Sequence, residues 1–466
     1  MKLGVVVLAA GKGTRMRSSR AKVLHACAGR PMLTWVLDAV GAASPAHTVV
    51  VVGHGAEDVA ASLPDGVTTA VQAEQRGTGH ATQVGLAALA PDCDHVVVAC
   101  GDTPLVRPQL FRALVESHAG SGHAATMVTA VLDDAGSYGR VVRSGDGAVE
   151  AVVEAADADD AQLALGEINA GIFCFSRPDL EDALTGLRAH NAQGELYLPD
   201  VLGAWPGRVG ALVSDDPDVV AGVNTRVQLA EVEEVLQRRL REELMLSGVT
   251  MTDPSRVYLE HGVEVGEDTV LYPGVHLTRA TKIGARCQIG PDVVIEGSTV
   301  GDDVAITAAR VHYSDVADGV TVGPFAYLRP GTDLREGAKV GTYVETKNST
   351  VGAGSKVPHL SYIGDATIGE GTNVGAGNIT ANYDGFRKHR TTIGSRVRTG
   401  SDCVMVAPVT IGDDAMTAAG SILTHDVPAG ALGIARARQS NIEGFTEKAA
   451  AKAAAAKAKA DGEASS

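Results

Sequence analysis

The feature that most constrains the fold is an aliphatic residue followed by glycine, which recurs through the second half of the chain. Several of these pairs lie eighteen residues apart and others lie six apart. Hexads of this kind stack as the coils of a parallel β-helix, with aliphatic side chains inward and a small residue at each corner. We therefore predict a left-handed β-helix over residues 250–445, in preference to an irregular glycine-rich β-domain. The pairs begin at Val265, Ile283, Ile289, Val300, Val322, Val340, Val351, Ile363, Ile368, Val374, Ile393 and Ile411.

Residues 1–226 follow another pattern, in which short apolar runs alternate with helical stretches such as Met32–Ala42 and Pro108–His118. This alternation predicts an α/β domain of Rossmann-like type, with a mostly parallel sheet covered by helices on both faces. Ligands of such sheets bind beyond the carboxyl ends of the strands. The runs that we expect to be strands are Leu3–Leu8, Thr48–Val52, His95–Ala99, Ala125–Val131 and Ile172–Phe175.

Two further segments complete the chain. Residues 227–249 contain strong helix formers with apolar residues at helical spacing, and Gly248 is a plausible stop, so we predict a long amphipathic arm between the domains. Residues 446–466 are rich in alanine and lysine, and then in glycine and serine. Because they offer too little apolar variety for a core, we expect a disordered segment or a frayed helix.

Composition and charge exclude several classes of function. The formal charge of −16 argues against general nucleic-acid binding, although a few local Lys and Arg can still hold a small anionic substrate. The six cysteines form no C-x-x-C pair, which predicts free thiols in a cytoplasmic protein rather than a zinc site or disulfides. No apolar stretch approaches the roughly 20 residues of a membrane span, and the N-terminal run lacks a signal-peptide cleavage motif.

A glycine-rich loop follows the first expected strand. Gly11 and Gly13 let backbone N–H groups approach a phosphate, and Lys12, Arg15 and Lys22 add positive charge. The spacing matches neither the P-loop nor the Rossmann fingerprint, so the loop alone is a weak indication. Longer strings are more specific and resemble the sugar-nucleotide pyrophosphorylases, which join a sugar 1-phosphate to a nucleoside triphosphate. These strings are Leu8–Met16, Lys22–Leu24, Gln72–Ala81, Gly101–Leu105, Tyr138–Arg140, Glu154, Glu167–Gly171 and Gly222–Asn224.

This resemblance implies a site for UTP, a sugar phosphate and Mg²⁺. Asp102 would supply the carboxylate that Mg²⁺ prefers, with Asn224 as its partner. Arg15 and Lys22 would act in catalysis by neutralising the charge that builds on the phosphates. Ala21 departs from the family pattern, which usually has proline there, and this puts the placement of Lys22 in doubt. The implied contacts are Gln72 and Thr78 with uracil, Gly139, Glu154 and Asn169 with the sugar, and Leu8, Ala9, Ala10, Gly11, Lys22, Gly77, Gly101, Asp102 and Asn224 with the UTP or UDP-sugar as a whole.

Polar residues interrupt the aliphatic pattern of the predicted β-helix. They are Arg329–Gly331, Lys347, His359–Tyr362, Asn373, Asn382–Gly385 and Lys388. Such helices often belong to CoA-dependent acyltransferases, although the fold can also serve as an oligomerisation rod. The interruptions resemble the acetyltransferase half of the bacterial bifunctional enzymes that make UDP-N-acetylglucosamine. His359 then fits the general base for the amine of glucosamine 1-phosphate, since imidazole has a reference pKa of about 6.5. The resemblance assigns Arg329, Lys347, Tyr362, Asn373 and Lys388 to the acetyl acceptor, and Ala376, Asn382, Tyr383, Ser401, Ala419 and Arg436 to acetyl-CoA.

The resemblance covers about residues 1–445. It implies that the C-terminal domain acetylates glucosamine 1-phosphate and that the N-terminal domain then uridylylates the product, giving UDP-N-acetylglucosamine for cell-wall synthesis. It also implies a homotrimer with acetyl-transfer sites between subunits, and small-molecule substrates rather than nucleic-acid or membrane partners. Two alternatives stay open. One is a monofunctional pyrophosphorylase whose β-helix oligomerises or regulates, against which His359 and its basic neighbours argue. The other is a scaffold with relic residues, against which Asp102 and Lys22 argue.

Overall fold

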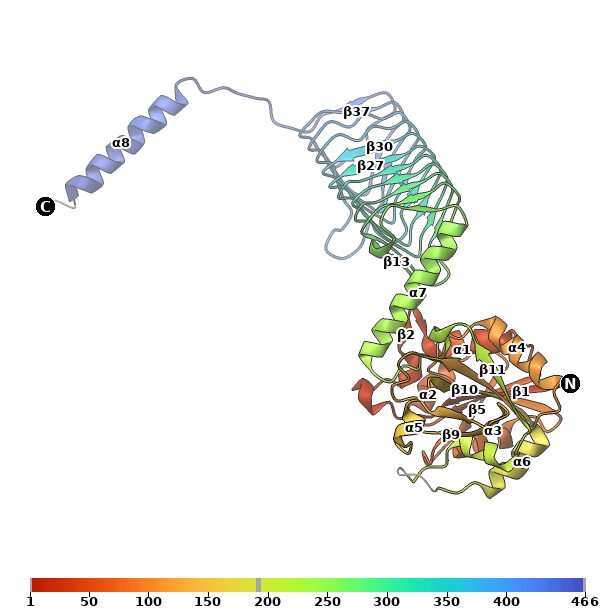
Figure 1. Ribbon diagram of the computed structural model, residues 1–466. Helices are drawn as coiled ribbons and strands as arrows, with labels where there is room; N and C mark the ends of the chain where they lie inside the picture. Colours follow the sequence, from red (N-terminus) through yellow and green to blue (C-terminus); the bar gives the residue numbers. More distant parts are fainter. Residues whose placement is uncertain (1, 190–193, 464–466) are drawn as a thin grey trace. The chain divides into compact units, whose positions relative to one another are not determined.

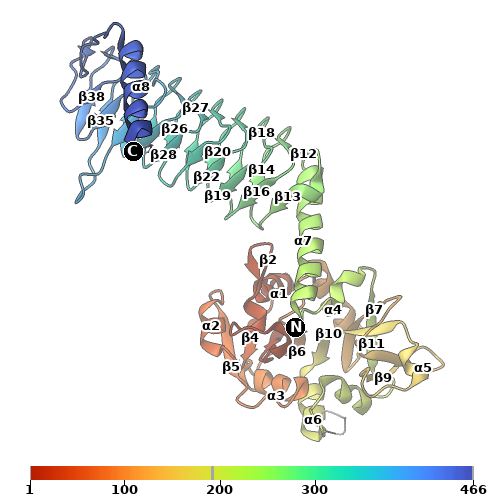
Figure 2. The same cartoon turned by 90° about the vertical axis from the view of Figure 1, so that its left-hand side faces the viewer.

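The structure, a computed structural model, describes residues 2–189 and 194–463 (Figures 1 and 2). The chain forms two compact units, Met1–Ala285 with Val294–Gly297, and Arg286–Val293 with Ser298–Ser466. The division falls inside the aliphatic–glycine repeat. The first coils therefore pack as part of the same compact unit as the N-terminal sheet.

The first unit is built on a sheet with the strand order β11-β7-β10-β6-β1-β4-β5. All neighbouring pairs are parallel except those of β10, which runs antiparallel to β6 and β7. This confirms the predicted α/β domain with a mostly parallel sheet. The strands are β1 (Leu3–Ala9), β4 (His47–Val52), β5 (Val67–Val71), β6 (His95–Cys100), β7 (Ala125–Val131), β10 (Glu167–Ser176) and β11 (Val209–Ser214), with the hairpin β8 (Arg140–Arg143) and β9 (Val149–Val153) beside β10.

The strands contribute side chains to two hydrophobic cores, one on each face of the sheet, because successive side chains of a strand point to opposite faces. In β1, Val5 and Val7 pack in one core with α1, α2 and α4, whereas Val6 packs in the other with α3 and α6. The two helical stretches predicted from the sequence correspond to α1 and α4 and are confirmed. The helices are α1 (Met32–Gly41), α2 (Ala56–Ala61), α3 (Thr78–Ala88), α4 (Pro108–Ala119), α5 (Asp160–Leu163) and α6 (Arg177–Gly186).

The predicted arm is α7 (Arg226–Leu246). Thr225 caps it by accepting the N–H of Gln228 (3.2 Å), while Gln228 Oε1 accepts the N–H of Thr225 (3.1 Å), which forms a capping box. The chain turns away at Gly248, whose φ of +100° suits glycine. The apolar stripe of α7 forms a third core with Met16, Cys27, Ala28, Met32, Leu105 and Val223.

The repeat forms three parallel sheets, the faces of the predicted left-handed β-helix. In the first unit its strands are β12 (Thr250–Met251) with β15 (Val270–Leu271), β13 (Val257–Leu259) with β16 (Val275–Thr278) and β19 (Val294–Glu296), and β14 (Glu264–Val265) with β17 (Lys282–Ile283). Within the second unit, Figure 2 shows the strands as successive rungs. There the first sheet contains β18 (Gln288–Ile289), β21 (Ala305–Ile306), β24 (Thr321–Val322), β27 (Lys339–Thr342) and β30 (Lys356–His359).

The other two sheets of the second unit follow the same scheme. The second sheet contains β22 (Arg310–His312), β25 (Tyr327–Leu328), β28 (Glu345–Lys347), β31 (Tyr362–Gly364), β33 (Ile379–Ala381), β35 (Val404–Val406) and β38 (Ile422–Leu423). The third contains β20 (Thr299–Val300), β23 (Asp315–Val316), β26 (Asp333–Leu334), β29 (Thr350–Val351), β32 (Ala366–Ile368), β34 (Thr391–Ile393) and β36 (Val409–Ile411). The strands β37 (Met416–Thr417) and β39 (Leu432–Gly433) pair at the last coil.

The spacing of the aliphatic–glycine pairs explains both the core of the β-helix and the loop at 382–390. The aliphatic residue of each aliphatic–glycine pair from Ile283 to Ile411 is buried, as the repeat predicts, and only Val265 is half-buried. Thr391 lies 25 residues after its partner Ala366 but 18 before its next partner Val409. The additional residues form a projecting loop at 382–390.

The C-terminal tail is helical where it is described, as α8 (Phe445–Glu463), rather than disordered chain. Alanine and lysine have high helix propensity, which explains a helix without a hydrophobic core. Among the described residues, no helix has the length and apolar character needed to cross a membrane.

Candidate active sites

A cleft opens at the carboxyl ends of β1, β5 and β6, where parallel sheets bind their ligands. Its volume is about 590 Å³. The glycine-rich loop after β1 leads into a single 3₁₀ turn, η1 (Thr14–Met16), and not directly into an α-helix. A phosphate at this loop would therefore be held by the N–H groups of the loop and by nearby cationic side chains, and not by the N-terminus of an α-helix. The predicted residues that line the cleft are Leu8, Ala9, Ala10, Gly11, Arg15, Lys22, Gln72, Gly77, Thr78, Asp102 and Asn224.

Three side chains meet at the floor of this cleft. The ammonium of Lys22 pairs with the carboxylate of Asp102 and donates to Asn224 Oδ1 (3.1 Å). The Lys22 and Asp102 side chains are only 13% and 17% exposed, so this pairing is shielded from water. A carboxylate and an amide oxygen aimed at one cation form a donor set that suits Mg²⁺. Asp102 and Asn224 therefore fit the ion that the sequence implied.

Backbone contacts bring these distant residues together. The N–H of Val223 donates to the carbonyl of Asp102 (3.0 Å), and the N–H of Asn224 donates to Gln228 Oε1 in the first turn of α7 (2.8 Å). Lys22 opens the 3₁₀ turn η2 (Lys22–Leu24) after Ala21, which has an extended backbone (φ −54°, ψ 135°). That conformation is also open to proline, so the alanine at 21 leaves the local backbone in the form that the family pattern requires.

The residues implied to contact uracil are tied into one loop. Gln72 is buried, and its Nε2 donates to the carbonyl of Gly77 (3.3 Å) and lies 3.1 Å from His80 Nδ1. Thr78 Oγ1 accepts the N–H of Leu198 (2.9 Å). At Gly77 a Cβ would lie 2.5 Å from the carbonyl oxygen of Leu196, so glycine alone fits there.

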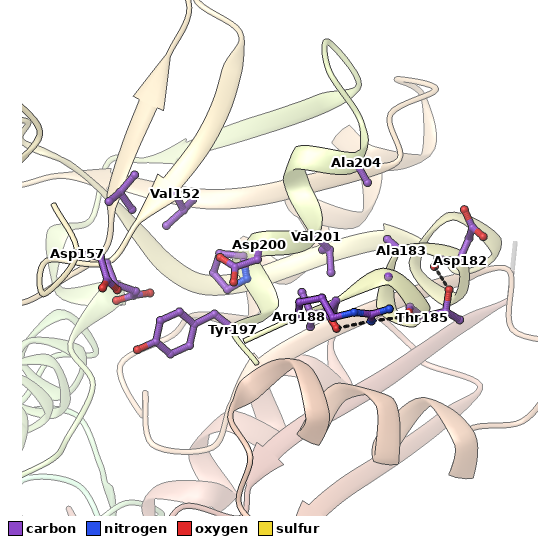
Figure 3. Close-up of a pocket in the computed structure, with 15 residues that line it drawn as sticks. Val152, Asp157, Asp182, Ala183, Thr185, Arg188, Tyr197, Asp200, Val201 and Ala204 are labelled. Carbon is purple, nitrogen blue, oxygen red and sulfur yellow. Dashed lines mark hydrogen bonds between the residues drawn. The ribbon is translucent and has the colours of Figure 1, made fainter. Parts of the chain in front are cut away.

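A second cavity of about 790 Å³, drawn in Figure 3, is lined by one of the three residues implied to hold the sugar. Glu154 lines this cavity, and a Cβ at Gly139 would lie 3.2 Å from Glu154 Oε1. The N–H of Asn169 donates to the carbonyl of Gly139 (2.9 Å), which joins all three predicted residues. Burial, and then the charges of Asp157 and Asp200, raise the pKa of Glu154. Gly101, by contrast, only supports the cleft, through its N–H to the carbonyl of Leu8 (2.9 Å).

Arg140 belongs to a motif that the sequence singled out without giving it a role. Its side chain is buried and donates to the carbonyls of Ala135 (3.3 Å), Gly136 (3.0 Å) and Leu163 (3.4 Å), as well as to that of Tyr138. A guanidinium offers five donors in a fixed plane, and here it fixes the loop that carries Gly139. Tyr197, which Figure 3 shows beside Asp157, also lines the second cavity, and no motif in the sequence pointed to it.

On the β-helix, three of the predicted acceptor residues, Arg329, Lys347 and Tyr362, lie on the second sheet, and Lys388 lies in the loop at 382–390. Contact with the Lys347 side chain, and then repulsion between the two ammonium groups, lower the pKa of Lys388. Two cations this close favour an anion such as a sugar phosphate. A Cβ at Gly364 would lie 2.4 Å from the hydroxyl of Tyr362, so Gly364 makes room for that ring. Arg329 Nη1 donates to Glu345 Oε1 (2.8 Å), which raises the pKa of Arg329.

Asp365 positions the loop that carries Lys388, and sequence reasoning missed it. This buried carboxylate accepts from the amides of Asn348 (2.6 Å) and Asn382. Burial raises its pKa, but these hydrogen bonds and the nearby lysines outweigh burial and lower the pKa overall. Asn382 therefore anchors the loop, whereas Tyr383 at its start is 62% exposed.

His359 begins a column of residues that were assigned to acetyl transfer. The N–H of the residue after each member donates to the carbonyl one coil below: Gly377 to His359 (3.4 Å), Asp402 to Ala376 (2.7 Å) and Gly420 to Ser401 (2.8 Å). His359, Ala376, Ser401 and Ala419 thus share one corner of successive coils. His359 is exposed, and its imidazole has no hydrogen-bond partner among the described residues. Arg436 is exposed beyond the last coil.

Asn373 is separated from the other acceptor residues. It bridges Lys356 and Arg398 and so continues the first sheet, with its side chain exposed. Arg329, Lys347 and Tyr362 belong to the second sheet. One chain therefore places the predicted acceptor residues on two faces of the β-helix.

Comparison with known families covers both parts of the chain. Residues 5–191 match the family described as MobA-like NTP transferase domain. Residues 280–308 and 390–425 match the hexapeptide repeat of succinyl-transferase. The matches agree with the two architectures seen here, an α/β domain and a β-helix.

Curated relatives match over nearly the full length. The bifunctional protein GlmU of Streptomyces avermitilis is 50% identical over 97% of this chain and 96% of its own. The protein of the same name from Streptomyces coelicolor is 49% identical over 98% of both chains, and that from Mycolicibacterium smegmatis is 48% identical over 97% of this chain and 96% of its own.

Proposed function

Because the chain belongs to the family of the bifunctional protein GlmU, we propose that its two domains make UDP-N-acetylglucosamine from glucosamine 1-phosphate in successive steps. The protein is a bifunctional transferase, an N-acetyltransferase and a uridylyltransferase. We assign acetyl transfer to residues 250–445 and uridylyl transfer to residues 1–226, with 227–249 as the connecting arm and no role for 446–466. Its free thiols suit a cytoplasmic enzyme.

In acetyl transfer, His359 is the general base. The amine of glucosamine 1-phosphate attacks the thioester carbon of acetyl-CoA, His359 takes the proton of the amine, and CoA leaves as the thiol. Lys347 and Lys388, with Arg329, hold the phosphate of the acceptor. Ala376, Ser401 and Ala419 continue the His359 column and give acetyl-CoA a path of small side chains along one corner. We assign Asn382, Tyr383 and Arg436 to the same ligand.

In uridylyl transfer, a phosphate oxygen of N-acetylglucosamine 1-phosphate attacks the α-phosphorus of UTP and pyrophosphate leaves. Lys22 and Arg15 stabilise the charge on the phosphates. Asp102 and Asn224 would hold Mg²⁺, which when bound would neutralise charge on the phosphates. Gln72 and Thr78 bind uracil, while Gly139, Glu154 and Asn169 bind the sugar.

We propose further that the active form is a homotrimer. Phe325, Tyr343 and Leu360 are large apolar residues on neighbouring coils, and they are 58%, 59% and 63% exposed. Phe325 and Tyr343 stack with ring centroids 5.3 Å apart. Exposed apolar patches on a regular rod favour burial against further copies. A second copy would also bring an Asn373 to the acceptor residues from which it is separated within one chain.

The observation that carries the proposal is that one chain holds two separate clusters of charged side chains. These are Lys22 with Asp102 and Asn224, and Lys347 with Lys388 on the β-helix that also carries His359. The test is a coupled assay with glucosamine 1-phosphate, acetyl-CoA, UTP and Mg²⁺. We expect CoA, pyrophosphate and UDP-N-acetylglucosamine, and no UDP-N-acetylglucosamine when acetyl-CoA is left out. A product formed only from N-acetylglucosamine 1-phosphate would identify a monofunctional enzyme, and no product would identify a scaffold.

A further inference from the structure

A short hairpin joins Lys22 to α1. Its strands β2 (Ala26–Cys27) and β3 (Arg30–Pro31) pair antiparallel, with Ala28 and Gly29 at the turn. Both turn residues have left-handed backbones, with φ of +46° and +78°. This suits Gly29 but strains Ala28, and such a backbone persists only where the surroundings hold it. The contacts of Ala28 therefore show what the hairpin depends on.

Both backbone groups of Ala28 are held from outside the hairpin. Its N–H donates to Glu233 Oε2 on α7 (2.6 Å), and its carbonyl accepts the N–H of His261 just after β13 (3.0 Å). Ala28 is fully buried. A Cβ at Gly29 would lie 2.6 Å from the carboxyl carbon of Glu260. The hairpin tip thus fits a socket made by α7 and the first coil of the β-helix.

Glu233 is itself fixed by a buried network. Gln237, one turn further along α7 and 3% exposed, donates from Nε2 to Glu233 Oε1 (2.9 Å) and to the carbonyl of Leu259 (2.6 Å). Its Oε1 accepts the N–H of Leu259 (2.9 Å). Burial, and then the charges of Glu233 and Glu260, raise the pKa of Tyr258 to about 12, so its hydroxyl remains a donor beside Glu233. A network whose donors and acceptors are satisfied holds its members in one arrangement.

The base of the hairpin leads directly to the uridylyl-transfer cleft. The N–H of His25 donates to the carbonyl of Lys22 (3.2 Å), so the hairpin continues the turn that carries this lysine. A Cβ at Gly13 would lie 2.8 Å from the Cβ of Lys22, so the aliphatic part of the Lys22 side chain packs closely on the glycine-rich loop. The helix that supplies Glu233 also begins beside Asn224, to which Lys22 donates (3.1 Å). One helix thus supports both the lysine and its acceptor.

We propose that Glu233 is a positioning residue for uridylyl transfer. With Gln237, it holds hairpin 26–31 against the first coil and so sets Lys22 against Asp102 and Asn224. This inference rests on the proposed role of Lys22 in the cleft. It means that the first coil of the β-helix serves the uridylyltransferase, although the remaining coils serve acetyl transfer.

The test uses the full-length chain with Glu233→Ala, Lys22→Ala and the double variant, and with Glu234→Ala as the control on the exposed side of α7. We expect Glu233→Ala to lower kcat for uridylyl transfer by about 10- to 100-fold, with KM changed less than about twofold, because misplacing a catalytic group weakens the transition state. The double variant should be no slower than Lys22→Ala, since Glu233 acts through Lys22. Acetyl transfer by the same samples should be unchanged.

Glu233→Gln keeps an oxygen for the N–H of Ala28 and should recover most of the lost kcat. Independent losses in the double variant, or a kcat equal to that of Glu234→Ala with only a lower Tm, would overturn the proposal and leave Glu233 a structural residue. If Lys22→Ala itself retains uridylyl transfer, the proposed function of the cleft fails instead. Should Glu233→Ala not fold, Gly29→Ala disturbs the same hairpin from the side of the coil and enters the same cycle.

Discussion

The two candidate sites differ in how much of each one chain builds. In the N-terminal domain, Lys22, Asp102 and Asn224 meet in a cleft and are shielded from water. On the β-helix, His359 is exposed on a corner and Asn373 lies on another sheet from Lys347. A sheet with loops at the ends of its strands can surround a ligand, whereas a rod of stacked coils offers flat faces. We therefore propose that a second copy closes the site on the β-helix, and that the cleft of the α/β domain needs none.

The largest expected effect tests the exposed site. His359→Ala should lower acetyl transfer by about 10²–10⁴-fold, the usual contribution of a general base, and should leave uridylyl transfer unchanged. His425→Ala, another exposed histidine of the β-helix, is the control. Acetyl transfer by His359→Ala at a rate close to that of His425→Ala would demote His359 to a structural residue.

The next effect tests the shielded site. Asp102→Ala should lower uridylyl transfer by about 10²–10³-fold, because it removes a preorganised charge from a water-poor cleft, while acetylation stays near normal. The loss should be greatest at limiting Mg²⁺ if this carboxylate holds the ion. Asp65→Ala, on an exposed loop of the same domain, should have no effect. Activity within a few-fold of the parent at limiting Mg²⁺ would assign the ion to another carboxylate.

Loss of the trimer should affect the two activities differently, and the ratio of their rates should change by about tenfold or more. Phe325→Ser with Tyr343→Ser removes the stacked pair at the exposed corners, so light scattering should show a shift from trimer to monomer. Acetyl transfer should fall and become dependent on protein concentration, whereas uridylyl transfer should not. Val213→Ser, at an exposed position of the N-terminal sheet, is the matched control. A monomeric parent protein with full acetyl transfer would show that the site on the β-helix needs no second copy.

The smallest effect concerns acid stability of the N-terminal unit. Burial, and then the nearby His95, lower the pKa of His118 to about 4. Between about pH 6.5 and 4, the unfolded chain therefore binds a proton at this histidine, whereas the folded chain does not. The free energy of unfolding falls by roughly 2–3 kcal/mol as the pH is lowered through this range. Both tryptophans, Trp35 and Trp205, lie in the first unit, so their fluorescence reports its unfolding alone. His118→Gln should flatten the dependence on pH, and an unchanged slope would contradict this assignment.

Local patterns were enough to predict the elements. Alternation of apolar runs with helices predicted the sheet with α1 and α4, and the interval between Val322 and Val340 predicted stacked coils. These features follow from residue spacing, because burying an apolar face requires side chains at a period of two, three to four, or six residues. The tail shows the limit of composition, since alanine favours a helix even where there is no core to pack against.

The sequence by itself determined the two architectures and, through its motifs, proposed most of the side chains of the two candidate sites. Only the tertiary structure decided which of them meet. Lys22 and Asn224 are brought together by the start of α7, Gly364 makes room for Tyr362, and Glu233 reaches Ala28 from another part of the chain. Such contacts join residues far apart in sequence, and no local spacing encodes them. They depend on packing and on buried polar groups finding partners, which exist only once the chain has folded.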